Sequence, residues 1–70
     1  MNEQQRQTVR DALANTTYAR NRMADAIDNY DAVDAFENLF EAERLLESAL
    51  EKVRTTRHFV FLAIPVEQIK

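Results

Sequence analysis

The sequence predicts an all-α fold, an antiparallel hairpin of two helices joined by one short turn. The 70 residues include no glycine and a single proline, Pro65, so the chain lacks the turn residues that a fold of many short strands needs. Apolar and small residues recur at helical spacing in two stretches, about 3–29 and 32–54, with the polar segment DNYD between them. We therefore expect one domain, residues 1–70, with its turn at about 28–31.

Both predicted helices carry an alanine every seven residues. These alanines are Ala12, Ala19 and Ala26 in the first helix and Ala35, Ala42 and Ala49 in the second. If the chain folds back at Tyr30 and Asp31, residue 26 meets 35, 19 meets 42 and 12 meets 49, so one register satisfies all three pairs. Small side chains let two helices approach near the short end of the usual ~8–10 Å range. The sequence thus predicts an Ala-rich heptad seam.

The positions beside the alanines follow the same register. Val9 falls opposite Val53, Thr16 opposite Leu46, Met23 opposite Leu39, Leu13 opposite Leu50 and Ile27 opposite Phe36. In the last of these rows Arg20 falls opposite Glu43. A charged pair in an apolar row costs desolvation but can fix register and orientation, so we interpret Arg20 and Glu43 as a register pair.

The turn itself contains residues suited to start the second helix. Asp28, Asn29 and Asp31 can each bond nearby backbone groups. Asp31 is the predicted N-cap, and Asp34 adds negative charge to the first turn of the new helix, where it is favourable.

A hairpin held only by an alanine seam buries little apolar area. At ~25 cal/mol per Å² its burial hardly offsets the chain entropy. The second helix carries further apolar residues around its side: Val33, Phe36, Phe40, Leu45 and Leu50. Another layer should cover them, and three candidates are open: a second copy that completes a four-helix bundle, the chain's own tail, or another protein. With no cysteine and one histidine, the chain has self-association as its remaining means of stabilisation, and we expect a homodimer.

The apolar tail, residues 58–66, contains the uninterrupted run FVFLAI from Phe59 to Ile64. In one interpretation the second helix continues to Pro65, because Val60, Ala63 and Ile64 keep its heptad phase. In the other, Thr55 and Thr56 break the helix and the tail is extended, which its aromatic and β-branched residues favour. We prefer the extended form, which must then pair with a strand outside its own hairpin.

Residues for catalysis or cofactor binding are sparse. The only serine, Ser48, and the only histidine, His58, are ten residues apart and do not share a helix face. Without glycine, neither a phosphate-binding loop nor a calcium loop can be written. The longest apolar run has six residues against the ~20 of a membrane helix. We expect no catalytic residue, cofactor, metal or membrane contact, and a cytoplasmic protein.

Charge is unevenly distributed. From Asp25 to Glu51 there are nine acidic residues and one basic residue, a net charge of -8, whereas the rest of the chain carries +5. The acidic tip comprises Asp25, Asp28, Asp31, Asp34 and Glu37. Such carboxylates usually form a solvated face, although a column of them can also imitate the phosphates of a nucleic acid. The net negative charge argues against nucleic acid as a partner.

The sequence therefore predicts a non-enzymatic protein–protein interaction module, an adaptor or inhibitor that occupies a partner's surface. The predicted contact residues are Val33, Phe36 and Phe40 near the tip and Phe59, Val60, Phe61, Leu62 and Ile64 in the tail. Two alternatives are an acidic nucleic-acid mimic that binds a basic protein and a structural assembly subunit.

Overall fold

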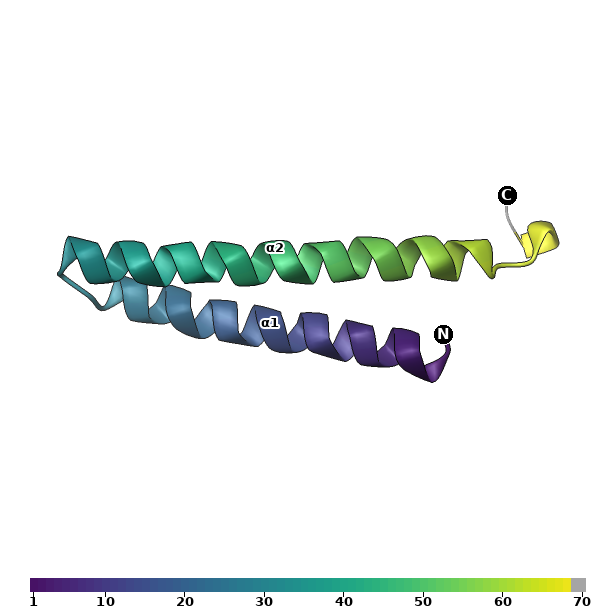
Figure 1. Ribbon diagram of the computed structural model, residues 1–70, viewed down its shortest axis with the longest axis horizontal. Helices are drawn as coiled ribbons and strands as arrows, with labels where there is room; N and C mark the ends of the chain where they lie inside the picture. Colours follow the sequence, from purple (N-terminus) through teal and green to yellow (C-terminus); the bar gives the residue numbers. More distant parts are fainter. Residues whose placement is uncertain (69–70) are drawn as a thin grey trace.

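The computed structural model describes residues 1–68 and confirms the helical hairpin. Helix α1 spans Glu3–Ile27, helix α2 spans Ala32–Leu62, and a single 3-10 turn, η1, spans Val66–Gln68. The two long helices lie side by side and antiparallel, and α2 continues well past the N-terminus of α1 (Figure 1). The molecule measures 56 × 23 × 13 Å, so it is an elongated rod with no second layer of its own.

Helix α1 begins with a capping box. The side chain of Asn2 accepts from the Gln5 backbone N–H at 2.8 Å, and the Gln5 side chain accepts from the Asn2 backbone N–H at 3.0 Å. Two of the N–H groups that a helix start leaves unpaired are thereby satisfied. At the other end the Asp28 N–H donates to the Ala24 carbonyl at 3.3 Å, and the helix stops at Ile27, two residues before the predicted end.

The turn places Asp31 at the start of α2, as the sequence predicts. Its carboxylate accepts from the Val33 backbone N–H at 2.9 Å, and its own N–H donates to the Asn29 side chain at 2.9 Å. Asp34 lies in the first turn of α2, where the exposed N–H groups attract negative charge. The hairpin reversal is thus made by short polar side chains in place of glycine.

The prediction of an extended tail is wrong, because α2 runs to Leu62 without a break at Thr55 or Thr56. Thr56 is buried on the α1 side of the helix and extends the contact between the helices past the predicted end at residue 54. Helical hydrogen bonds satisfy the backbone groups that an extended segment would have left unpaired. The helix closes just before Pro65, where the Ile64 N–H donates to the Phe61 carbonyl at 3.1 Å.

The core of the hairpin is made of small side chains. The buried apolar residues are Ala12, Ala19, Ala42 and Ala49. Ala26 and Ala35, nearest the turn, are half-buried. No large side chain among residues 1–68 is fully buried. The described helices also include none with the length and hydropathy that a membrane crossing requires.

Polar side chains lie between the alanines and join the two helices. The Asn15 amide contacts Ser48 Oγ at 3.1 Å. In the amide orientation that satisfies both of its atoms, the Asn15 oxygen also accepts from Lys52 Nζ at 3.0 Å. Closer to the turn, Arg22 donates to Asn38 Oδ1 at 3.3 Å. Small and polar residues therefore alternate along the contact, and the larger apolar residues are left for other surfaces.

Candidate interaction surface

One side of the hairpin carries a broad apolar surface, which we call the apolar face. Its apolar members fall within a series of alternating spacings of three and four along each helix, a pattern that keeps them on one side; Thr16, Arg20, Glu43 and Arg57 occupy the remaining positions of the series. The apolar members are Val9, Leu13, Met23 and Ile27 of α1, Phe36, Leu39, Leu46, Leu50, Val53 and Val60 of α2, and Ile64 just after α2. Apart from half-buried Val60, all are exposed, from 36% for Val9 to 83% for Ile27.

Two shallow grooves lie on the apolar face. The groove nearer the turn is lined by Met23 of α1 and by Leu39, Leu46 and Leu50 of α2, among others. The groove nearer the chain ends is lined by Val9 of α1, by α2 residues that include Val53, Val60 and Phe61, and by Ile64 just after α2. Both grooves take residues from the two helices, so the helix pair forms this surface and neither helix could form it alone.

Each groove also contains charge. Glu43 and Glu47 line the groove nearer the turn, and Arg57 lines the groove nearer the chain ends. Glu43 and Arg57 lie two heptads apart in the same row of α2 as Leu50. Each groove is thus largely apolar and contains charge of a single sign, negative in the groove nearer the turn and positive in the groove nearer the chain ends.

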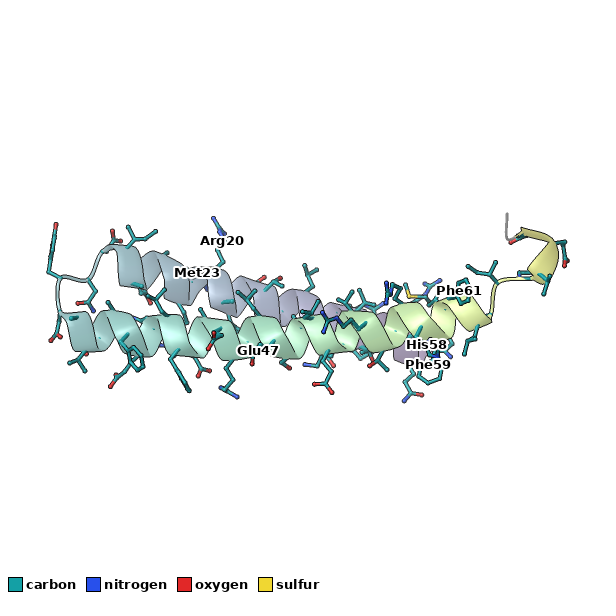
Figure 2. All side chains as sticks on the ribbon, turned by 90° about the horizontal axis from the view of Figure 1, so that it is seen from above. Arg20, Met23, Glu47, His58, Phe59 and Phe61 are labelled. Carbon is teal, nitrogen blue, oxygen red and sulfur yellow. The ribbon has the colours of Figure 1, made fainter. Side chains whose placement is uncertain are left out.

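The predicted register pair is not made as an ion pair. The two ion pairs found within residues 1–68 join Arg10 to Glu3 and Arg44 to Glu41. Arg20 and Glu43 are both exposed, and Figure 2 shows the Arg20 side chain pointing away from α2. The reason is geometric: both residues lie on the side of the hairpin that carries the apolar face, where each side chain reaches water. Any contribution of this pair to register stays a prediction.

The predicted contact residues near the turn lie on two sides of α2. Phe36 belongs to the apolar face, whereas Val33 and Phe40 lie on the side of α2 that points away from α1. The rings of Phe36 and Phe40 stack with their centroids 6.1 Å apart, and this contact connects the two sides. All three side chains are more than half exposed.

The predicted contact residues of the tail lie on several sides of the chain at the end of α2. Val60 and Ile64 continue the apolar face, and Figure 2 shows Phe61 on one edge of α2 and Phe59 on the other. Phe59 lines a polar hollow beside the start of α1, next to His58, whose ring lies edge-on at 5.6 Å. Leu62 is also exposed. The end of α2 is therefore apolar on most of its circumference.

The acidic tip consists of exposed side chains around the turn, and two of its members have structural roles. Asp28 is the C-cap of α1 and Asp31 is the N-cap of α2. Asp34 and Glu37 line a polar hollow together with Arg22, while Asp25 is exposed on the last turns of α1. Among the described residues, no group of three histidine, cysteine or acidic side chains is placed to hold a metal ion.

One carboxylate behind the tip is held by a specific partner. Arg44 donates to both oxygens of Glu41, at 2.6 and 3.1 Å. This hydrogen bonding lowers the pKa of Glu41 and raises that of Arg44. Arg44 therefore favours the charged form of Glu41, and the two charges offset each other.

Sequence reasoning did not identify much of this surface, and three residues of α2 are the clearest cases. It placed Leu39, Leu46 and Val53 in contact with α1, but the structure leaves them 53%, 40% and 46% exposed. The signal was present in the sequence, because residues 36, 39, 43, 46, 50, 53, 57, 60 and 64 form an unbroken series of spacings of three and four. A helix with two such series can pack on two sides.

Fold and surface together define a small amphipathic helical hairpin with one unpartnered apolar side. Compared with protein families, with curated proteins and with solved structures, the chain matches none. The interpretation of its function therefore rests on the surface itself.

Proposed function

We propose that this protein is a non-enzymatic protein–protein interaction module that dimerises through its apolar face into a four-helix bundle. The observation that carries the proposal is the unpartnered series of large apolar residues that follows α2 from Phe36 to Val60 and ends at Ile64, just after the helix. A surface of this width on a protein of 70 residues marks an association site.

The energetics of the hairpin support the same proposal. Its seam buries four alanines and one threonine, and no large side chain is fully buried. Burial of one leucine-sized side chain contributes roughly 1.5–3 kcal/mol, so covering the apolar face adds the stability that the seam cannot supply. A small helical unit of this kind gains its core by association.

The proposal includes one register for all three alanine pairs of the seam. Two polar contacts support it. The Asn15–Ser48 contact lies between the levels of the Ala12–Ala49 and Ala19–Ala42 pairs, and the Arg22–Asn38 contact lies between the latter and the Ala26–Ala35 pair. Each contact separates two alanine levels, as a continuous heptad seam requires.

Dimerisation is tested by solution mass. The full chain is expected to have the mass of a dimer in light scattering, whereas Leu46→Glu places a charge in the apolar face and should produce monomer. Tyr18→Glu is the matched control, since Tyr18 is 61% exposed on the other side of α1 and should leave the dimer intact. A monomeric full chain would overturn the proposed dimer.

The adaptor or inhibitor role needs a second surface that dimerisation leaves free. Val33 and Phe40 lie on the side of α2 that points away from α1, and both are more than half exposed. Aromatic side chains supply much of the binding energy in protein interfaces. We propose that this side of α2, with Phe59 and Leu62 beside it, contacts the protein on which the module acts.

A photo-crosslinking amino acid at position 40 tests the second surface in the living cell. We expect a covalent adduct with one other protein, identified by mass, and no such adduct from position 30, where Tyr30 is fully exposed on the turn. Adducts with copies of the same chain alone would instead favour a structural assembly subunit.

A further inference from the structure

We propose that the occupant of the apolar face is a second copy whose turn lies at the opposite end, with α2 packed antiparallel on α2 and Leu50 at the two-fold axis. This register rests on the proposed dimerisation and specifies its geometry. It places Glu43 of each copy against Arg57 of the other.

The outer row of α2 is chemically self-complementary about Leu50. In an antiparallel pair with Leu50 opposite Leu50, Phe36 falls opposite Ile64 and Glu43 opposite Arg57. In the neighbouring row of α2, Leu39 falls opposite Val60 and Leu46 falls opposite Val53. Every apolar residue of the series meets an apolar residue, and each acid meets a base, which a two-fold interface requires of a single surface.

The two grooves support the same arrangement. The groove nearer the turn carries Glu43, and the groove nearer the chain ends carries Arg57. When the second copy is turned end for end, the groove with Glu43 in each copy packs against the groove with Arg57 in the other. The two charged side chains are then desolvated together, and this pairing selects the antiparallel register.

The length of α2 distinguishes this geometry from the alternative with both turns at one end. Val60, near the end of α2, and Ile64, two residues after the helix ends, lie where the chain passes the start of α1 (Figure 1). With the turns at one end, α2 packs on α1 of the other copy, which offers no partner for Ile64. With the turns at opposite ends, Phe36 and Leu39 of the second copy cover this overhang.

The charge distribution along the hairpin also favours opposite turns. Residues 16–46, the half that contains the turn, carry seven acidic and three basic side chains, a net charge of -4. The other half carries five acidic and six basic side chains, a net charge of +1. Opposite turns set the negative half of one copy on the positive half of the other, whereas turns at one end set two negative halves together.

A single engineered cysteine tests the two-fold axis, because the chain contains none of its own. Leu50→Cys is expected to form a disulfide-linked dimer under mild oxidation, since the two Cα atoms come within the ~4.4–6.8 Å that a disulfide spans. Tyr18→Cys, on the other side of the hairpin, is the control and should remain reduced. With the turns at one end, the two copies of residue 50 lie across the bundle diagonal and do not link.

The alternative has its own positive signal. Mixing 15N-labelled Leu13→Cys with unlabelled Leu50→Cys gives a disulfide of intermediate mass only if α1 packs on α2 of the other copy. We expect Leu50→Cys to link to itself and this mixed product to be absent. The mixed product without self-linked Leu50→Cys would overturn the proposed register and leave the dimer standing.

Charge exchange tests the pairing independently. Glu43→Arg and Arg57→Glu should each weaken the dimer by about tenfold or more, as breaking a desolvated charge pair does. The double variant should restore it, because both pairs form again with their signs reversed. Rescue of Glu43→Arg by Arg20→Glu instead would overturn this register, and a wild-type chain that is monomeric by mass would overturn the dimerisation on which it rests.

Discussion

Ala19 has no exposed surface and is the most completely buried residue between the two helices. Leu at this position must push the helices apart, because the seam has no space for three more carbon atoms. We expect Ala19→Leu to lower the free energy of unfolding by about 1–3 kcal/mol, as overpacking does. Urea denaturation at fixed chain concentration measures it. Ala24→Leu is the matched control on an exposed position of the same helix and should be close to neutral; equal effects of the two changes would contradict the close seam.

Asp31 belongs to the acidic tip, and its side chain caps α2. Asp31→Ala should cost about 1 kcal/mol of stability, because the Val33 N–H then loses its acceptor. Asp31→Asn keeps the acceptor and removes the charge, so we expect its stability to match that of the wild type. Thermal unfolding of the two variants side by side separates capping from charge. A loss of stability in Asp31→Asn as large as in Asp31→Ala would show that the charge, and not the cap, is what matters.

The same pair of variants bears on the nucleic-acid mimic. A mimic needs the tip charge itself, so Asp31→Asn combined with Asp28→Asn should weaken binding to a basic protein while leaving the fold unchanged. For the interaction module that we propose, the double variant should dimerise and make its position-40 adduct as the wild type does. A loss of that adduct in the stable double variant would favour the mimic.

At the scale of elements, α2 is the main departure from what the sequence predicts. The hairpin, the turn and the N-cap at Asp31 could be predicted, because helical periodicity and cap chemistry are local signals. The end of α2 could not be predicted, because the intrinsic preferences of Phe59, Val60 and Phe61 favour a strand and the deciding contact is tertiary. Buried Thr56 packs the helix against α1, and α2 then continues to Leu62.

The candidate surface was likewise predicted in part. Phe36 and Ile64 are exposed and Val60 is half-buried, and the eight predicted contact residues are distributed over more than one side of α2. Sequence periodicity gives the angle of a residue around its own helix. It does not say how far the neighbouring helix reaches around that angle, and an alanine seam reaches only a short way. Leu39 and Leu46 were therefore assigned to the seam and are in fact on the surface.

The helical state of the tail can be measured directly. We expect positive 13Cα secondary shifts for residues 59–62, as in a helix, because the α2 hydrogen-bond pattern continues through them. Val60→Pro should abolish those shifts upstream of the proline, since it removes a donor and clashes with the preceding turn. Negative shifts in the wild-type tail would restore the extended interpretation and would remove Val60 and Ile64 from the apolar face.

At the scale of the whole molecule, a lateral dimer and an end-to-end assembly differ in length. The hairpin is 56 Å long, and a second copy packed along the apolar face adds thickness but little length. We therefore expect a maximum dimension in small-angle X-ray scattering close to that of one hairpin, with the forward scattering of two. A maximum dimension near twice the hairpin length would indicate end-to-end association and favour the assembly subunit.

The stability of this molecule should depend on its concentration. The seam buries only small side chains, so in the proposed dimer most of the apolar burial would come from the second copy, and dissociation and unfolding should be coupled. For a folded dimer that unfolds to two chains, a tenfold rise in concentration adds about 1.4 kcal/mol and should raise the Tm by roughly 3–6 °C. Circular dichroism melts over two decades of concentration measure this shift. Leu46→Glu, which blocks the apolar face, should be less stable and show no such dependence. A wild-type Tm that stays constant across the same range would mean that the alanine seam alone holds the hairpin, and that the apolar face is free for another protein.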